Sequence, residues 1–171
     1  TILIEGAMLA MHIAPGLRRH FAAEKWKAVP GNIWDNERIA AKALERRDEG
    51  FLAFGYDIDP EAVRLTLENA KKAGVAQYIS AEVRDIKDFS NDGPFGCVIC
   101  NPPYGERLLD VKTAEDIYKT MGRVFTPKRG WSYAAISPDE RFETCFGKKA
   151  DRRRKLYNGM IRCQYYMYFK A

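Results

Sequence analysis

The stretch FGCVICNPPYGERL, residues 95–108, decides the fold that we expect. Its apolar run from Cys97 to Cys100 is typical of a buried strand, and an asparagine, two prolines and a tyrosine follow directly. The prolines end the sheet pairing, because neither has an N–H to donate to a neighbouring strand. Asn101 and Tyr104 are therefore expected on a stiff loop at the carboxyl end of a strand, where open α/β sheets hold their ligands. An amide beside an aromatic ring suits a flat molecule with hydrogen-bonding edges and π faces.

The composition is that of one domain with a moderate positive charge. The chain has 171 residues, 46% of them hydrophobic, which is enough for a core. A net charge of +5 is compatible with a polyanionic partner without establishing one. No apolar run is long enough to span a membrane, and no signal peptide opens the chain. We expect a single domain over residues 1–171 that does not insert into a membrane; the oligomeric state stays open.

The four cysteines favour a reducing compartment over a metal site. Cys97 and Cys100 form a C-x-x-C pair inside the expected strand, where side chains three residues apart point to opposite faces. Cys145 and Cys163 supply no second pair of this kind. We therefore expect no metal ion, small buried cysteines and a cytoplasmic protein.

Helices and strands alternate along most of the chain. Expected helices cover residues 1–14, 37–48, 60–73, 114–125 and 140–146, and expected strands cover 51–59, 78–83, 95–100, 131–136, 156–160 and 163–169. Residues 17–34 read as an irregular excursion, and 127–130 as a turn. Asp59 caps the helix that starts at Pro60, and Gly74 ends it. The expected hairpin of the last two strands is organised around Asn158-Gly159, a favoured hairpin dipeptide that falls within the range 156–160. This order predicts an α/β fold with a mostly parallel, twisted sheet and an antiparallel C-terminal hairpin.

Polar residues follow three successive expected strands. Asp57 and Asp59 follow the first, Asp85 the second and Asn101 the third. In a parallel sheet these ends share one edge, so the side chains are expected to converge. Asp57 suits the hydroxyls of a ribose, since a carboxylate at the exit of a buried strand is costly without a partner. Asp85 suits the amine of an adenine, although a solvated loop acid is the alternative; Asp59 is assigned to the helix cap.

Three motifs together resemble a known enzyme family. NPPYGER (101–107), GYDID (55–59) and TILIE (1–5) resemble class I S-adenosylmethionine-dependent methyltransferases that modify exocyclic amino nitrogens. More specifically, the chain is similar to the THUMP-containing bacterial rRNA guanine-N2 methyltransferases, often labelled N6-adenine-specific DNA methylases. The likeness covers nearly the whole chain, and residues 12–26 look like that family's insertion after its first helix. It implies a Rossmann-like fold, S-adenosylmethionine as cofactor and guanine N2 of 23S rRNA as target, with RNA rather than DNA as the partner.

The resemblance also implies roles for single residues. The catalytic set is Asn101, Pro102, Pro103 and Tyr104, and the cofactor set is Thr1, Asp57, Ile58, Asp85, Ile86 and Asn101. In this hypothesis the Asn101 side-chain oxygen and the Pro102 carbonyl oxygen accept hydrogen bonds from the two N–H groups of the target amine. Tyr104 stacks on a base that has been flipped out of its helix.

A basic cluster precedes the last strands. It consists of Lys148, Lys149, Arg152, Arg153, Arg154 and Lys155. Such runs are usually solvated, and edge strands carry Lys and Arg against aggregation. Near the NPPY loop the cluster also suits nucleic-acid phosphates, and both interpretations stay open.

The chain departs from the family pattern at its start. In the family, a strand and a glycine-rich loop, DPxCGSG, precede the helix that begins TILIE and wrap the methionine part of the cofactor. Family topology places that strand between the strands that end at Asp57 and Asn101. We expect the strand, the loop and a THUMP-type RNA-binding module to belong to the intact protein.

Other functions remain open at this stage. An amide and a carbonyl that hold a planar amine do not distinguish guanine from adenine or from a carboxamide. Adenine-N6 methylation of DNA or RNA and glutamine methylation of a protein are therefore alternatives. A structural or binding fragment without cofactor is a further alternative from a different class.

Overall fold

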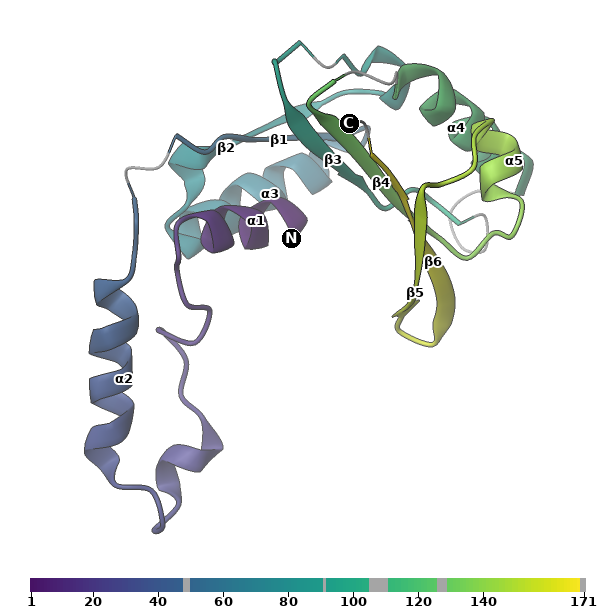
Figure 1. Cartoon of the computed structure of the whole chain (residues 1–171). Helices are drawn as coiled ribbons and strands as arrows, with labels where there is room; N and C mark the ends of the chain where they lie inside the picture. The colour runs from purple at the N-terminus through teal and green to yellow at the C-terminus, as the bar shows by residue number, and fades with distance from the viewer. Residues whose placement is uncertain (48–49, 91, 105–110, 126–128, 170–171) are drawn as a thin grey trace. The chain divides into compact units, whose positions relative to one another are not determined.

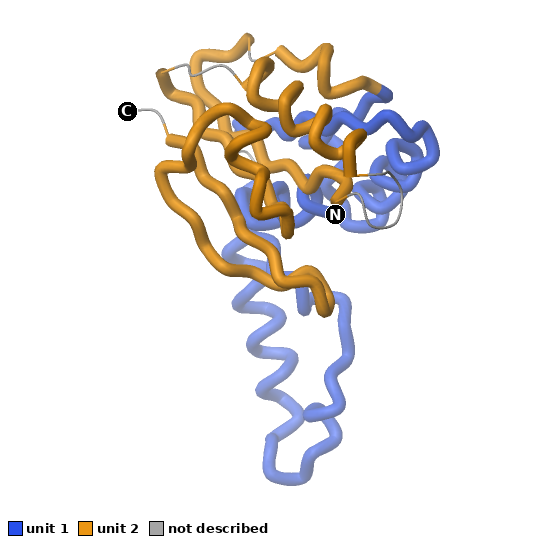
Figure 2. The backbone as a smooth tube through the Cα atoms, turned by 90° about the vertical axis from the view of Figure 1, so that its right-hand side faces the viewer, with its two compact units in different colours: residues 1–83 blue, residues 84–171 orange. Residues whose placement is uncertain are grey.

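The computed structural model describes residues 1–47, 50–90, 92–104, 111–125 and 129–169. The chain forms two compact units, Thr1–Val83 (unit 1) and Arg84–Ala171 (unit 2), which Figure 2 shows in separate colours. Each unit contains its own sheet, with two described strands in unit 1 and four in unit 2.

Unit 1 is built on two parallel strands. Its elements are α1 (Ile2–Ala10), η1 (Ala22–Lys25), α2 (Gly31–Ala43), β1 (Ala53–Asp57), α3 (Pro60–Ala73), η2 (Ala76–Tyr78) and β2 (Ile79–Val83). α1 and α3 pack on the strands around a core that includes Ala7, Ala70 and Val75. α1 approaches β1 closely at Gly55, where an added Cβ would lie 2.3 Å from Leu3 Cδ1 and the end of the Leu3 side chain would have to shift. In Figure 1, α2 extends away from this layer, and none of its residues is buried.

α3 has the termini that its sequence predicts. The Asp59 carboxylate accepts a hydrogen bond from the Glu61 backbone N–H at 2.9 Å, and Pro60 is the first helical residue. Gly74 ends the helix in the left-handed region, with φ of 74°. The assignment of Asp59 to the cap is confirmed.

The predicted end of the first helix is wrong. α1 ends at Ala10, because His12 adopts a left-handed backbone with φ of 52°. The His12 N–H donates to the Leu9 carbonyl at 3.2 Å and the Ile13 N–H to the Met8 carbonyl at 2.8 Å. This is the Schellman pattern, with His12 in the left-handed position that glycine usually occupies, so the helix ends before Pro15 and Gly16.

The predicted bounds of the second helix, 37–48, are also wrong. α2 begins at Gly31 and ends at Ala43. Pro30 occupies the N-cap position, where its missing N–H breaks no helical hydrogen bond. The Pro-Gly pair thus starts this helix, although the sequence pattern marks it as a breaker. Asp48, the predicted last residue, lies outside the described residues.

The first strand is not buried on both faces, contrary to the prediction. Phe54 and Ile58 are 58% and 70% exposed, whereas Ala53 and Gly55 face the helices of unit 1. β1 pairs with β2, and α1 and α3 cover one face of the pair. The alternation reflects this one-sided cover, so the apolar sequence overstates the burial of β1.

Unit 2 contains a mixed sheet of four strands. Its elements are η3 (Ile86–Asp88), β3 (Gly96–Cys100), α4 (Val111–Val124), β4 (Trp131–Ser137), α5 (Phe142–Phe146), β5 (Arg152–Asn158) and β6 (Ile161–Tyr168). β3 and β4 are parallel, and β6 runs antiparallel to both β4 and β5. β3, β4 and β5 therefore run in one direction, and their carboxyl ends share one edge of the sheet. The predicted parallel sheet with an antiparallel C-terminal hairpin is confirmed.

Aromatic side chains form the core of unit 2. α4 and α5 cover one sheet face, where Phe142 stacks on Tyr166 and Phe146 on Tyr168, each pair at 4.5 Å between ring centroids. α4 approaches α5 closely at Gly122, where an added Cβ would lie 2.0 Å from the Phe146 carbonyl oxygen. The two helices therefore depend on a residue without a side chain at this contact.

The hairpin begins earlier than predicted and turns one residue later. β5 starts at Arg152, and Asn158 is its last residue, paired with Ile161. Gly159 has φ of 60°, whereas Met160 is not among the residues with positive φ. A glycine with positive φ at the first turn position is the II′ type, which leaves Asn158 in the strand. The basic run was not recognised as a strand because edge strands tolerate charge that interior strands do not.

The cysteines of β3 differ in exposure. Cys97 is exposed and Cys100 is half-buried, as alternation along a strand requires, so the predicted burial of Cys97 is wrong. The described residues contain no cluster of three or more His, Cys, Asp or Glu side chains that could hold a metal ion. They contain no helix that is both long and apolar enough to cross a membrane. Pro127 of the predicted turn and motif residues 105–108 lie outside the described part.

Candidate active site

The NPPY loop lies where its sequence predicts, directly after β3 in unit 2. Asn101 is exposed, Pro102 is buried, and Pro103 and Tyr104 are half-buried. The loop thus presents the Asn101 amide to solvent from an anchored backbone. The carboxyl ends of β4 and β5 lie at the same edge, so residues from three strand ends can contribute to one site.

Two hydrogen bonds link Asn101, Tyr104 and Asn158. The Tyr104 hydroxyl donates to Asn101 Oδ1 at 2.6 Å, and Asn158 Nδ2 donates to the Tyr104 hydroxyl oxygen at 3.3 Å. Asn158 is the last residue of β5, so the hairpin contacts the loop that follows β3. The Asn101 amide is therefore oriented by two side chains.

A second set of hydrogen bonds holds the loop backbone. The Tyr118 hydroxyl of α4 donates to the Pro103 carbonyl at 3.2 Å, and Ser137 Oγ donates to the Tyr118 hydroxyl at 3.2 Å. The Asp139 N–H in turn donates to Ser137 Oγ at 3.1 Å. Tyr118 and Ser137 are fully buried. Because these groups are shielded from water and satisfied, they fix the loop to the end of β4.

Burial affects both tyrosines of the site in the same direction. Desolvation raises the pKa of Tyr104 and of Tyr118 above the ordinary value of 10.0. Both hydroxyls therefore keep the protons that they donate at physiological pH.

Three predicted cofactor residues belong to unit 1. Asp57 ends β1, and its Oδ1 accepts a hydrogen bond from the Asp59 N–H at 3.0 Å. Ile58 follows and is 70% exposed, and Thr1 is the exposed N-cap residue of α1. Asp57 is itself exposed, so the predicted cost of burying its charge does not apply.

The other predicted cofactor residues, Asp85, Ile86 and Asn101, belong to unit 2. Asp85 caps η3: its Oδ1 accepts from the Lys87 N–H at 2.9 Å, and its Oδ2 lies 3.4 Å from Lys87 Nζ. The backbone hydrogen bond from Lys87 is the main cause that lowers the pKa of Asp85. Ile86 packs partly against the aromatic core. Asp85 thus has local partners, in addition to any ligand.

The residues of the basic cluster lie in two kinds of surroundings: some contact a carboxylate or aromatic rings, and others are exposed on the opposite face of β5 or before it. Arg153 Nη2 lies 2.5 Å from Glu143 Oε2, and its guanidinium lies over the Tyr166 ring at 5.8 Å. Lys148 and Lys155 lie over the rings of Tyr168 and Tyr157. The exposed members of the cluster on the opposite face of β5 are Arg152 and Arg154, and Lys149 is exposed before the strand.

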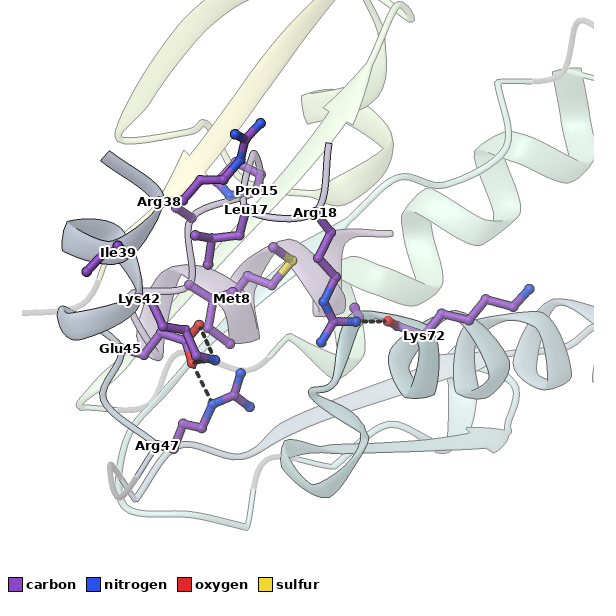
Figure 3. A pocket seen from close by; sticks show the side chains of 13 residues that line it. Met8, Pro15, Leu17, Arg18, Arg38, Ile39, Lys42, Glu45, Arg47 and Lys72 are labelled. Carbon is purple, nitrogen blue, oxygen red and sulfur yellow. Dashed lines mark hydrogen bonds and ion pairs between the residues drawn. The ribbon is translucent and has the colours of Figure 1, made fainter. Parts of the chain in front are cut away.

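A separate cavity of about 540 Å³ lies in unit 1, between α2 and the segment after α1 (Figure 3). Its wall combines apolar side chains with several cations. Arg18 and Arg47 donate to the carbonyls of Lys72 and Gly74, each at 3.0 Å, at the end of α3. Lys42 and Arg47 also pair with Glu45. These cations have local structural partners, and the wall contains no strand end, so the NPPY edge remains the candidate active site.

The sequence pattern did not reveal Tyr118, Ser137 and Asn158 as parts of the site. Tyr118 has the spacing of a core residue of α4, and Asn158 has the pattern of a turn residue. Ser137 offers a signal, because a serine followed by Pro138 and Asp139 ends an apolar strand in the same way as Asn101. A polar residue at a strand end was the rule that located the other site residues.

Comparison with known proteins identifies the family. Residues 1–167 match UPF0020, described as an RMKL-like methyltransferase domain. YpsC of Bacillus subtilis (strain 168), a candidate RNA methyltransferase by name, is 38% identical over 169 residues, which are 99% of this chain and 44% of YpsC. The ribosomal RNA large subunit methyltransferase K/L of Methylococcus capsulatus (Bath) is 36% identical over 176 residues, 98% of this chain and 23% of that protein. The chain thus spans less than half the length of these relatives.

Solved structures agree with the fold. SMU.472, described as a candidate methyltransferase complexed with SAH, has a TM-score of 0.93 and 37% identity over 99% of this chain and 45% of its own. A predicted N6-adenine-specific DNA methylase from Listeria monocytogenes has a TM-score of 0.88 and 34% identity over 98% of this chain and 43% of its own. These matches confirm the predicted fold, which is that of class I methyltransferases. The chain belongs to the RMKL-like methyltransferase domain family, UPF0020.

Proposed function

We propose that this chain is the catalytic domain of an enzyme that methylates the exocyclic amine of an RNA base, with guanine N2 of 23S rRNA as the target. The observation that carries the proposal is the exposed Asn101 amide, whose oxygen is held by the Tyr104 hydroxyl at the carboxyl edge of the sheet. The name of the M. capsulatus relative, a large-subunit rRNA methyltransferase, supports the choice of RNA. With a bacterial ribosomal substrate, the proposed compartment is the cytoplasm.

The residues present fit S-adenosylmethionine in chemical type. Asp57 offers an exposed carboxylate that suits ribose hydroxyls, and the exposed Ile58 beside it suits the face of an adenine. Asp85 and Ile86 offer a second carboxylate and a second apolar side chain for the adenine. Thr1 is the proposed contact on the methionine side. The SAH complex of SMU.472 supports this choice of cofactor.

The proposed chemistry depends on two acceptors in the loop. Bound S-adenosylmethionine supplies a methyl group on a positively charged sulfur, which makes the methyl carbon electrophilic. The target amine is a poor nucleophile, because its lone pair is conjugated with the base. Asn101 Oδ1 and the Pro102 carbonyl oxygen each accept a hydrogen bond from one N–H group of this amine. These two hydrogen bonds favour a pyramidal nitrogen with an available lone pair. The same acceptors stabilise the positive charge that develops on this nitrogen.

Tyr104 is the proposed support for the target base. Its hydroxyl is engaged with Asn101 and Asn158, which restrains the ring. A restrained aromatic face is suited to stack on a base that has left its own helix. One residue would thus support the base and orient the amide that holds the amine.

Arg152 and Arg154 are the first proposed phosphate contacts. Side chains alternate along a strand, so both lie on the face of β5 that also carries Asn158. Arg154 precedes Asn158 by about 13 Å along the strand, at about 3.3 Å per residue. These guanidinium groups could bind the backbone of an RNA strand that delivers its base to Tyr104. Lys148, Lys149, Arg153 and Lys155 complete the proposed basic surface.

Adenine N6 is the second candidate target. The specific observation in its favour is the name of the L. monocytogenes structure, an N6-adenine-specific DNA methylase with 34% identity. The two acceptors of the loop bind either amine. Discrimination therefore has to come from groups that read the rest of the base.

A substrate panel tests the proposal. The full-length protein is incubated with methyl-labelled S-adenosylmethionine and unmodified large-subunit rRNA, duplex DNA, or a glutamine-containing peptide, and the labelled product is digested and identified. The proposal predicts label in rRNA as N2-methylguanosine. Label as N6-methyladenosine would contradict the guanine assignment and favour the second candidate. Label in the peptide, or none with any substrate, would contradict nucleic-acid methylation.

A further inference from the structure

We propose that Asn158 is a positioning residue for methyl transfer: through the Tyr104 hydroxyl it fixes the orientation of the Asn101 amide. The inference rests on the proposed function, because it assigns Asn101 to the target amine. It adds a residue from the C-terminal hairpin, far from the NPPY motif in sequence. Asn158 acts through Tyr104 and does not contact the substrate.

The two hydrogen bonds that join these three side chains run in one direction, from Asn158 through Tyr104 to Asn101. Asn158 Nδ2 donates to the Tyr104 hydroxyl oxygen at 3.3 Å, and that hydroxyl donates to Asn101 Oδ1 at 2.6 Å. A side-chain NH₂ group only donates, so the Tyr104 oxygen acts as the acceptor from Asn158. The single hydroxyl hydrogen is then left for Asn101.

This direction decides which end of the Asn101 amide faces the substrate. Oδ1 has two lone pairs, one of which accepts from Tyr104 and the other of which remains for an N–H of the target amine. If the amide flipped, its NH₂ group would lie against the Tyr104 hydroxyl hydrogen and the N–H bonds of the target. No acceptor would then be available to that amine. The Tyr104 hydroxyl, itself oriented by Asn158, prevents this.

The hairpin geometry makes Asn158 available for this role. Gly159, with φ of 60°, provides the positive backbone angle of the turn, so the turn does not require Asn158. Asn158 is instead the last residue of β5, paired with Ile161, and it is exposed. Because β5 runs in the same direction as β3, its carboxyl end lies at the edge that carries the NPPY loop. Strand direction and turn type together bring the amide to Tyr104.

Kinetics of the full-length protein test the relay. In single-turnover methyl transfer to rRNA, Asn158→Ala is expected to lower the rate about two- to tenfold, the range of one lost hydrogen bond, with unchanged RNA affinity. Asn158→Asp is expected to lower the rate further, because its carboxylate accepts the Tyr104 hydrogen and withdraws it from Asn101. Tyr104→Phe keeps the ring and removes the hydroxyl. In that background, Asn158→Ala should have no additional effect.

Met160→Ala is the control, since Met160 lies in the same hairpin and is 98% exposed. It should leave the rate unchanged. A wild-type rate for Asn158→Ala would overturn the proposal. The proposal would also be overturned if Asn158→Ala lowered the rate of methyl transfer by the same factor with and without the Tyr104 hydroxyl.

A structural measurement separates this proposal from the proposed function. In NMR spectra of protein with isotope-labelled asparagine, Tyr104→Phe should shift the side-chain NH₂ signals of both Asn158 and Asn101, and Met160→Ala should not shift those of Asn101. Unchanged signals in Tyr104→Phe would overturn the relay, whatever the substrate is. Absence of methyl transfer by the wild-type protein would contradict the proposed function instead.

Discussion

Arg153 and Arg154 are neighbours in sequence with different surroundings. Arg153 faces the helices of unit 2, where it pairs with Glu143, whose side chain is only 13% exposed. Arg154 faces the other side of β5, opposite Tyr165. A guanidinium with a partly buried carboxylate partner is less available to a phosphate than one on an exposed face.

These surroundings predict that substitution by serine affects mainly RNA binding at Arg154 and mainly stability at Arg153. Arg154→Ser should weaken RNA binding and reduce the slope of log affinity against log salt by about 1, because one phosphate contact is lost. Arg153→Ser should reduce the slope by less than Arg154→Ser does, because Glu143 already pairs with Arg153, and should lower the free energy of unfolding by up to about 1 kcal/mol. Filter binding at several salt concentrations and thermal melting of the full-length variants measure the two effects. Equal slopes for Arg154→Ser and wild type would contradict the assignment.

The sequence predicts the position of a residue correctly where its immediate neighbours in the chain determine that position. Two prolines after an apolar strand leave few positions for Asn101 and Tyr104, and their loop was correctly predicted. Asp59 was correctly predicted as a cap, because Pro60 follows it. Tyr118, Ser137 and Asn158 were missed, because their role depends on contacts between elements that are distant in sequence.

At the scale of elements, the contact between α4 and α5 depends on Gly122. A methyl group at this position would lie 2.0 Å from the Phe146 carbonyl oxygen, and backbone on both sides would have to move. The helices could separate only by disturbing the aromatic stack of Phe142 and Phe146 on β6.

Gly122→Ala is therefore expected to lower the free energy of unfolding by about 1–3 kcal/mol, the usual cost of overpacking. Gly31→Ala is the matched control, since an added Cβ at Gly31 meets nothing within 4 Å. Denaturant unfolding of the full-length variants measures the difference. A Gly122→Ala variant as stable as the control would show that α4 and α5 are not in this contact.

The segment before α2 is held to it by Glu24. The Phe21 N–H donates to Glu24 Oε1 at 2.9 Å, and His20 and Arg38 also contact the carboxylate. The Phe21 hydrogen bond, followed by His20 and Arg38, lowers the pKa of Glu24 from 4.5 to about 2. A lowered pKa in the folded state means that the ionised carboxylate stabilises the fold.

This stabilisation should be complete above about pH 4.5 and should disappear as the pH falls to about 2. Glu24→Gln removes the charge, so its melting temperature should lie below that of the wild type at neutral pH. The two values should converge as the pH approaches 2. A difference that is constant over this pH range would contradict the role of the charge.

Element types were easier to predict than element limits. α3 was predicted correctly, because its cap, first proline and final glycine all agree. α1 and α2 ended elsewhere, because His12 took the left-handed position of a glycine and Pro30 began a helix. β5 was shortened in the prediction, because its arginines are exposed on an edge strand and leave no apolar pattern.

At the scale of the whole molecule, the strand edges are informative. Within the described residues, β1 pairs only with β2 and β3 only with β4, so each has an edge without a strand partner. We propose that a further strand and a glycine-rich loop, which the family resemblance implies, belong to the intact protein. Relatives are more than twice as long as this chain, which spans 44% of YpsC.

Cofactor binding tests this expectation. The full-length protein should bind S-adenosylmethionine saturably in calorimetric titration, and the 171-residue chain should bind it more weakly or not at all. Asp57→Ala in the full-length protein should weaken binding about tenfold or more, the effect of losing charged hydrogen bonds to a ribose. Equal affinities of the short and full-length chains would contradict the need for the additional strand and loop.

The proposed function depends on the Asn101 amide, which is proposed to hold the amine that receives the methyl group. Its most direct test is the single-turnover rate of methyl transfer to unmodified rRNA by full-length wild-type protein and Asn101→Ala, with melting temperature as the control for folding. The rate of Asn101→Ala should fall about 10²–10³-fold, the effect of removing one positioned group that stabilises developing charge, while the melting temperature stays the same. A near-normal rate in a folded Asn101→Ala variant would contradict the assignment of this loop as the active site.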